Sequence, residues 1–230
     1  RDLVRSRGLG DVYKRQTQVT MTTNGVLLQD NLEALKKAGL AGINISLDTL
    51  DREKYQEITG TDACETVRQA VAAAAESGIR TKVNTVLQSD GDKTEWKALI
   101  TLAESLPVDV RFIELMPIGY GKENTGVSNL ELLDEIRKVY PDIRKDSKIH
   151  GNGPAVYYQI PGFTGGIGFI SAMHGKFCKN CNRIRLTSTG DLKPCLCYGD
   201  IYPLKELLKS GTDDAVSYTH LRAHETVLDL

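Results

Sequence analysis

The sequence predicts an α/β fold, in which a mostly parallel sheet of βα units carries a smaller, mixed C-terminal part. Strand-like and helix-like segments alternate four times with short joints between residues 18 and 116, as in parallel βα units. After residue 116 the pattern changes to loops, short strands and single helices, and four of the five cysteines lie there between residues 178 and 197. Four units are too few to close a barrel, so the sheet is expected to be open or truncated.

The elements of the first part follow from hydrophobic periodicity and from glycine stops. The alanine run at 72–75 favours a helix, and Gly39 and Gly78 are placed to end the helices before them. Strands are expected over 18–23, 43–47, 80–87 and 108–115, and helices over 31–38, within 48–60, over 63–77 and over 93–105.

The C-terminal part is expected to begin with an amphipathic helix over 128–139, with Ser128 as its N-cap and Glu131 at capping-box spacing. Short strands are expected over 154–160, 166–171, 183–187 and 191–195, and a last helix over 203–209. Residues 188–191 have turn-forming composition, so the last two strands form a hairpin. This hairpin brings Cys195 towards the C-x2-C pair of Cys178 and Cys181.

Alternation along the four strands of the first part places polar side chains on one face. This face turns polar towards the C-terminal end of each strand, which is where βα folds place their sites. The residues expected on it are Thr20, Thr22 and Asn24, then Asn44, Ser46 and Asp48, then Lys82, Asn84 and Val86, and finally Phe112, Glu114 and Met116.

Three or four thiolates that converge on one point suit zinc or an iron–sulfur cluster. Arg183 and Arg185 lie two residues apart on one strand, so both guanidinium groups leave the same face, next to the metal. Such a pair favours a site for an anionic substrate over a closed structural zinc ribbon. A disulfide is the alternative, but nothing else in the sequence looks secreted. Cys64 is expected to be a small buried residue.

Composition argues against two classes of partner. The 230 residues carry a net charge of −1 and offer no aromatic platform, so nucleic acid is not an expected partner. No apolar run is long enough to span a membrane and no signal peptide is visible, so we expect no membrane partner and a cytoplasmic protein.

Both ends of the chain look foreign to the rest. Residues 1–16 and 216–230 resemble translated linker or adapter sequence, which is excluded from fold reasoning. The alternative is a native polar tail and a short terminal helix that would carry His220 and His224. The expected division is a non-native segment 1–16, a partial barrel 17–126, a cluster- and GTP-binding part 127–215, and a non-native segment 216–230.

Five motifs, in order, carry a family resemblance. They are MTTNG (21–25), INISLD (43–48), KVNTVL (82–87), RFIELM (111–116) and FCKNCNRIRL (177–186) with a later CL pair. From about residue 18 to 215 the chain resembles the molybdenum cofactor biosynthesis protein A family, the GTP 3′,8-cyclases among radical S-adenosylmethionine enzymes. The resemblance implies a partial (βα)6 barrel, truncated here to its last four βα strands.

The resemblance also implies two [4Fe-4S] clusters and the conversion of GTP to (8S)-3′,8-cyclo-7,8-dihydroguanosine 5′-triphosphate. The first cluster cleaves S-adenosylmethionine, and the resulting radical takes the ribose 3′ hydrogen of GTP. The second, three-cysteine cluster leaves one iron open to the purine. By position, the cluster ligands are Cys178, Cys181 and Cys195, the GTP contacts are Thr22, Lys82, Arg183, Ile184 and Arg185, and the S-adenosylmethionine contacts are Ser46 and Met116. The intact protein is expected to allow a homodimer.

Two departures from the family qualify this expectation. The C-x3-C-x2-C motif of the radical-generating cluster is absent, so the chain as given is expected to be inactive. The first two strands of the family are absent too, so we expect an exposed sheet edge and low stability. Cys197 stands where the family usually has phenylalanine, and it is either a fourth ligand or a core residue. The alternatives are a non-catalytic zinc or iron–sulfur module, and another radical S-adenosylmethionine enzyme with an auxiliary cluster, such as a peptide maturase.

Overall fold

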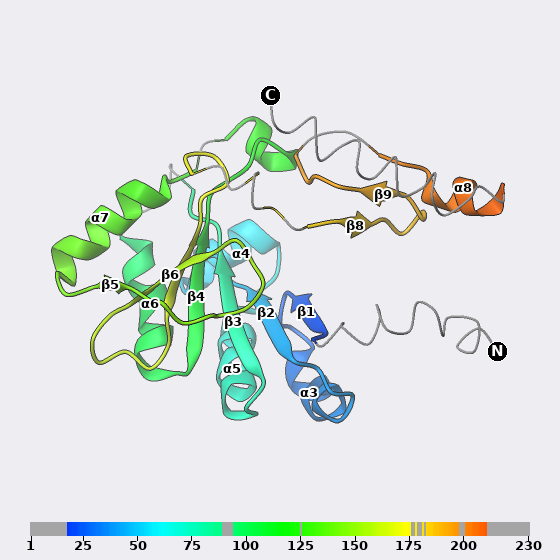
Figure 1. Ribbon diagram of the computed structural model, residues 1–230. Coiled ribbons are helices and arrows are strands. Elements are labelled where there is room, and N and C mark those ends of the chain that lie inside the picture. The colour runs from blue at the N-terminus through cyan, green and yellow to red at the C-terminus, as the bar shows by residue number, and fades with distance from the viewer. Residues whose placement is uncertain are drawn as a thin grey trace.

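Seven strands form one mixed sheet in the computed structural model of the chain (Figure 1). The structure describes residues 18–210 except 89–93, 125, 176–177, 179–180, 182 and 198–200. The two segments expected to be non-native, with His220 and His224, lie outside the described residues. No helix within the described ranges is both long and apolar enough to cross a bilayer.

The first four strands are parallel and follow one another in chain order, as the sequence predicts. They are β1 (Thr20–Thr23), β2 (Gly42–Ser46), β3 (Arg80–Thr85) and β4 (Val108–Ile113). Next to β4 lies β7 (Ile167–Ile170), again parallel, followed by the antiparallel β6 (Val156–Gln159) and β5 (Arg144–Lys145). Strands from beyond residue 126 therefore extend the sheet of the first part. The sequence did not predict β5.

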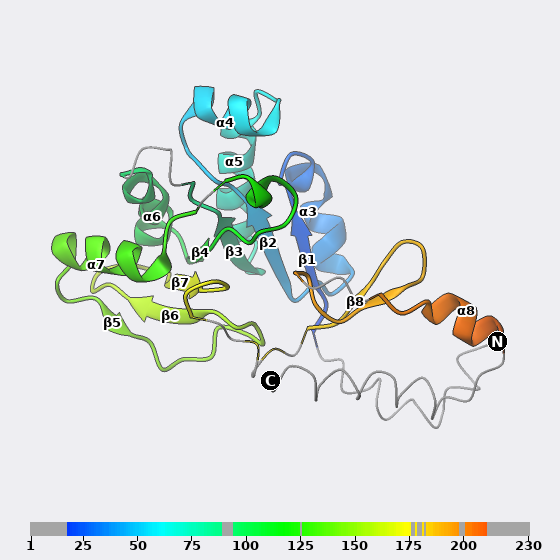
Figure 2. The same cartoon turned by 90° about the horizontal axis from the view of Figure 1, so that it is seen from above.

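Four helices cover one face of this sheet (Figure 2). They are α3 (Leu28–Lys37), α4 (Arg52–Thr59), α5 (Cys64–Glu76) and α6 (Glu95–Ser105). A 3-10 turn, η1 (Gly119–Lys122), and α7 (Asn129–Val139) follow β4. Each predicted helix is present within a few residues of its expected bounds. Ser128 caps α7 as predicted, since its side chain accepts a hydrogen bond from the Leu130 amide.

The hydrophobic core lies between the sheet and these helices, and strand register explains its composition. Residues that pair across neighbouring strands form rows of side chains that face the helices. One such row is Ile45, Val83, Val110 and Ile167. Phe112 is 1% exposed and stacks on Phe169 at 6.0 Å between ring centroids. The opposite rows therefore form a separate, polar face.

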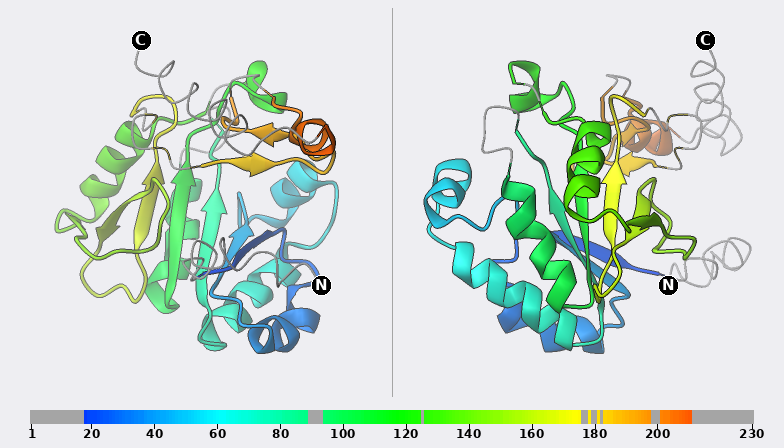
Figure 3. Two further views of the ribbon diagram at one scale, coloured as in Figure 1. Left: turned by 45° about the vertical axis from the view of Figure 1, so that its right-hand side comes forward. Right: turned by 90° about the vertical axis from the view of Figure 1, so that its left-hand side faces the viewer.

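The predicted cysteine hairpin is present as β8 (Arg185–Leu186) paired antiparallel with β9 (Leu192–Lys193). Its turn uses Gly190 at φ +90°, a left-handed conformation that favours glycine. The hairpin lies beyond the C-terminal ends of the first strands (Figures 1 and 3). The helix α8 (Leu204–Lys209) lies at its turn, where the Lys205 amide donates to the Gly190 carbonyl at 2.9 Å. All five cysteines are free, so the disulfide alternative is not realised here.

Candidate functional site

The polar face of the sheet carries two adjacent rows of side chains that register places side by side. Thr22, Asn44, Lys82 and Asp109 form the first row across β1 to β4. Ser46, Asn84 and Arg111 form the second row, one step nearer the C-terminal ends of the strands. The polar face predicted for the first three strands is therefore confirmed.

The prediction for the fourth strand was wrong. Phe112 lies in the buried core, and Asp109 and Arg111 are the residues of β4 that point to the polar face. Glu114 and Met116, on which that prediction depends, lie beyond the end of β4 at Ile113. The pattern V-D-V-R-F contained the correct signal, since the polar residues at 109 and 111 alternate with apolar ones.

Lys82 lies at the centre of the polar face and is buried, with 7% of its surface exposed. Its Nζ donates to the Tyr157 hydroxyl at 2.8 Å and to the His150 carbonyl, and it stands 3.6 Å from the Asp109 carboxylate. These three partners occupy the three donors of an ammonium group. Burial lowers the pKa of Lys82 to about 8, and the neighbouring Arg111 and Arg80 act in the same direction, while Asp109 opposes them.

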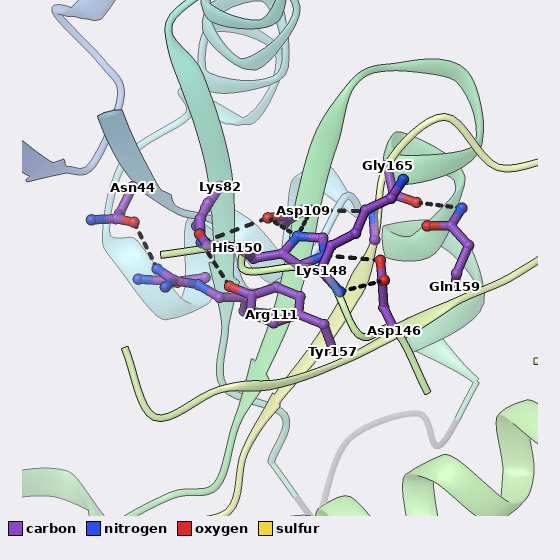
Figure 4. Close-up of polar contacts among 12 residues, drawn as sticks. Asn44, Lys82, Asp109, Arg111, Asp146, Lys148, His150, Tyr157, Gln159 and Gly165 are labelled. Carbon is purple, nitrogen blue, oxygen red and sulfur yellow. Dashed lines mark hydrogen bonds and ion pairs between the residues drawn. The ribbon is translucent and has the colours of Figure 1, made fainter. Parts of the chain in front are cut away.

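The segment 146–153 crosses this face in front of β4 and β3, opposite the helices (Figures 1 and 3). Its His150 joins two carboxylates, because Nδ1 lies 3.0 Å from Asp109 and Nε2 lies 3.0 Å from Asp146 (Figure 4). The imidazole also stacks on Tyr157 at 4.0 Å between ring centroids. Burial raises the pKa of Tyr157 to about 12, so its hydroxyl remains a donor at neutral pH. We call 146–153 the crossing segment.

Arg111 links the strands of the polar face. Its Nε donates to Asn84 Oδ1 at 2.8 Å and its Nη2 to Asn44 Oδ1 at 2.7 Å. Asn44 in turn donates to Thr22 Oγ1 at 3.3 Å. One guanidinium group therefore orients a chain of polar groups that ends at the predicted GTP contact Thr22.

Basic side chains gather where the crossing segment meets the sheet and the hairpin. A Cβ at Gly151 would stand 3.6 Å from Lys82 Nζ and 3.7 Å from Arg80 Nη1. A Cβ at Gly153 would stand 3.2 Å from Arg183 Nη2, so the hairpin arginine reaches the same segment. The structure thus brings Lys82 and Arg183 to one segment, although they are a hundred residues apart in the sequence.

The remaining predicted contacts lie around this centre. Thr22 and Ser46 are exposed on the polar face, and Ile184 is 66% exposed on the hairpin. Met116 lies in the loop after β4 and is half-buried, with its Sδ 3.5 Å from Cys197 Sγ. Arg185 is half-buried and close enough to Cys197 to act on its thiol.

Cys197 lies near Cys195 and Cys178, but the described thiols form no ligand shell. Cys178 and Cys181 are exposed, and the Cys181 amide donates to the Cys178 carbonyl at 3.1 Å. Burial raises the pKa of Cys197, and the nearby Cys195 and Cys178 raise it further, while Arg185 and Lys193 oppose this. In the part of the chain that the structure describes, no three His, Cys, Asp or Glu side chains are placed to hold a metal ion. The thiols suit an iron–sulfur cluster by their chemistry, but not by their described positions.

The structure also shows the surroundings of Cys64 and Cys197. Cys64 is 5% exposed at the start of α5, as expected for a small buried residue. Cys197 is not part of the hydrophobic core, since it is half-buried and meets Met116 at the C-terminal edge of the sheet.

Two family matches cover most of the chain. Residues 108–225 match Molybdenum Cofactor Synthesis C, and residues 3–103 match the Radical SAM superfamily. These matches begin and end inside the terminal segments 1–16 and 216–230 that were expected to be non-native.

Curated proteins show the same likeness. A GTP 3′,8-cyclase from Clostridium perfringens (strain SM101 / Type A) is 43% identical over 197 residues, covering 86% of this chain and 61% of the relative. One from Peptoclostridium acidaminophilum is 38% identical, with 93% of this chain and 64% of the relative covered. Molybdenum cofactor biosynthesis protein 1 of Drosophila melanogaster is 39% identical, covering 89% of this chain and 36% of that protein. The chain therefore spans less than two thirds of the length of these relatives.

Proposed function

The chain belongs to the Molybdenum Cofactor Synthesis C family, and on this premise we propose that it is part of a GTP 3′,8-cyclase. The proposed activity converts GTP to (8S)-3′,8-cyclo-7,8-dihydroguanosine 5′-triphosphate by radical S-adenosylmethionine chemistry. Its support is the likeness to proteins of that name, together with a match to the Radical SAM superfamily over the first half of the chain.

The observation that carries the proposal is the gathering of basic groups from distant parts of the chain around the crossing segment. Lys82 and Arg80 of β3 lie against Gly151, and Arg183 of the hairpin lies against Gly153. A triphosphate needs several cations in one place, because guanidinium and ammonium groups offset its charge and donate hydrogen bonds to its oxygens. This arrangement favours a GTP site between the polar face and the hairpin.

Within this proposal the basic residues have different roles. Arg183 is exposed and offers free surface to phosphate oxygens. Lys82 is already bonded to His150, Tyr157 and Asp109, so it acts on the triphosphate through its charge. Thr22, held in place through Asn44 and Arg111, is a hydrogen-bonding contact at the edge of the site.

We assign Cys178, Cys181 and Cys195 to the three-cysteine [4Fe-4S] cluster, and Ser46 and Met116 to S-adenosylmethionine. When bound, such a cluster supplies an open iron that can take a purine nitrogen or oxygen. Arg185 and Lys193 place positive charge beside Cys197, at the far end of the same segment.

Binding of GTP to the 230-residue chain tests the proposal. We expect the Arg183→Ala variant to bind GTP about tenfold more weakly, because it loses charged hydrogen bonds to phosphate. The matched control is Arg137→Ala. Arg137 is an exposed arginine on α7, far along the chain from the site, and it pairs with Asp134 at 3.1 Å. Equal affinity of the two variants for GTP, measured by isothermal titration calorimetry, would contradict the proposed site.

Metal content separates the proposal from a non-catalytic module. After anaerobic reconstitution with ferrous iron and sulfide, about four iron and four sulfide per chain are expected from one [4Fe-4S] cluster. One tightly held zinc ion without sulfide would instead indicate a structural metal module.

A further inference from the structure

Glu114 is a buried carboxylate for which the proposed function supplies no role. It follows β4 directly and is 2% exposed. Its Oε1 accepts a hydrogen bond from the Asn129 amide at 3.0 Å, and its Oε2 accepts from the amides of Met173 at 2.7 Å and His174 at 2.9 Å. The His174 ring lies 3.3 Å from Oε1. Few side chains in the described residues bind so many backbone groups at once.

These partners belong to two segments that are distant in the sequence. Asn129 is the first residue of α7, so the carboxylate lies at the positive end of the helix dipole. The Asn129 side chain also donates to Ser171 Oγ at 3.2 Å, and this hydrogen bond ties α7 to the end of β7. Met173 and His174 follow β7 and lead to Cys178 four residues later. Glu114 therefore fixes the chain just before the first cysteine of the hairpin segment.

The other end of the cysteine segment meets the same stretch of chain. Cys197, the last of the four clustered cysteines, has its Sγ 3.5 Å from the Sδ of Met116. Met116 is two residues after Glu114. The exit of β4 thus contacts the chain at Met173 and His174, ahead of Cys178, and again at Cys197. These contacts lie on the two sides of the four clustered thiols.

Buried ionised carboxylates are expensive unless hydrogen bonds offset the lost hydration. Burial acts to raise the pKa of Glu114, but the three backbone hydrogen bonds and His174 outweigh it and hold the pKa below its ordinary value. The carboxylate is therefore charged at neutral pH, and its hydrogen bonds are of the strong, charge-assisted kind.

We propose that Glu114 is a positioning residue, which holds the cysteine segment 178–197 against the end of β4 so that Cys178 and Cys197 stay close. This inference rests on the proposed function in one respect: the proposed function assigns the clustered thiols to an iron–sulfur cluster. A residue with a merely structural role would lower stability without changing the distance between the two thiols in the folded state.

Thiol bridging measures that distance without any metal. In a parent chain with Cys181→Ser and Cys195→Ser, only Cys178 and Cys197 remain outside the buried Cys64. Dibromobimane becomes fluorescent when it bridges two neighbouring thiols, and its bridging rate is measured at a temperature where near-UV circular dichroism shows every variant folded. We expect Glu114→Gln to bridge measurably more slowly than the parent, since loss of charged hydrogen bonds raises the population in which the cysteine segment is released from the end of β4.

The matched control is Glu95→Gln. Glu95 is another largely buried carboxylate, at 14% side-chain exposure, and accepts from Thr49 at 3.1 Å and from Lys54 at 2.8 Å. Its partners belong to the first part of the chain and not to the cysteine segment, so its loss should leave the bridging rate unchanged. Glu114→Asp keeps the charge on a shorter side chain and should give an intermediate rate, which also serves if Glu114→Gln does not fold.

Equal bridging rates in the parent and in Glu114→Gln would overturn the inference, as would an equal loss in Glu95→Gln. Iron and sulfide content of the chain with all its cysteines separates this inference from the proposed function. Lower content in Glu114→Gln than in Glu95→Gln supports both. If the unsubstituted chain takes up no cluster while Glu114→Gln still slows bridging, the proposed function fails and the positioning role stands.

Discussion

Replacing Lys82 by methionine should change how the free energy of unfolding depends on pH. Lys82 is 7% exposed, and burial lowers its pKa from 10.5 to about 8. Between these values the unfolded chain binds more protons than the folded chain, so the free energy of unfolding rises with pH. The full difference corresponds to about 3 kcal/mol, of which about 2 kcal/mol is gained between about pH 7 and about pH 9.5.

Urea denaturation followed by circular dichroism, at several pH values in this range, measures the effect. The quantity of interest is the wild-type free energy of unfolding minus that of Lys82→Met, because groups common to both chains cancel. Tyr157 has its pKa raised to about 12, so its opposite contribution, a loss of stability with rising pH, falls above this range. A difference that stays constant across the range would show that Lys82 is not held in the folded chain as a destabilised cation.

Three further predictions concern the fold, and each is measured by urea denaturation. Asp51→Ala should lower the free energy of unfolding by about 1 kcal/mol, since Asp51 caps α4 by accepting from the Lys54 amide at 2.8 Å. Asp51→Asn can still cap and should lower it much less. Equal losses in the two variants would refute the capping role. Gly165→Ala should destabilise the fold far more than Gly60→Ala, because a Cβ at Gly165 would lie 1.9 Å from a backbone oxygen. A Cβ at Gly60 would meet open space, and the left-handed φ of +72° there should cost an alanine about 1–2 kcal/mol. Phe112→Ala should cost about 3–5 kcal/mol by opening a cavity in the core, and a loss below about 1 kcal/mol would mean that the ring is not packed as described.

The position of the fourth strand shows where reasoning from sequence stops. Alternation states which residues share a face, but it does not state where a strand ends or which face is buried. The prediction of the polar face depends on Glu114 and Met116, which lie beyond the end of β4. It therefore places Phe112 on the polar face and overlooks Asp109 and Arg111. Only the pairing of Lys82 with Asp109 and of Asn84 with Arg111 in the sheet resolves this.

The crossing segment is a second case. The sequence around His150 has no periodicity and no motif, so nothing marked it as part of a site. Its importance arises from contacts across long separations, such as His150 with Asp109 and its carbonyl with Lys82. Such contacts form because a buried cation and a buried carboxylate need partners, whichever part of the chain supplies them.

By itself the sequence determined the local elements: the four βα strands, the helices and their caps, and the hairpin that carries the cysteines. These follow from periodicity and turn chemistry, which act over a few residues and depend little on the rest of the chain. Tertiary structure alone decided that strands from beyond residue 126 join the same sheet, that Arg183 meets the segment over Lys82, and that Glu114 holds the approach to Cys178. Those outcomes depend on strand register and on the partners that buried polar groups require, and both are properties of the packed chain.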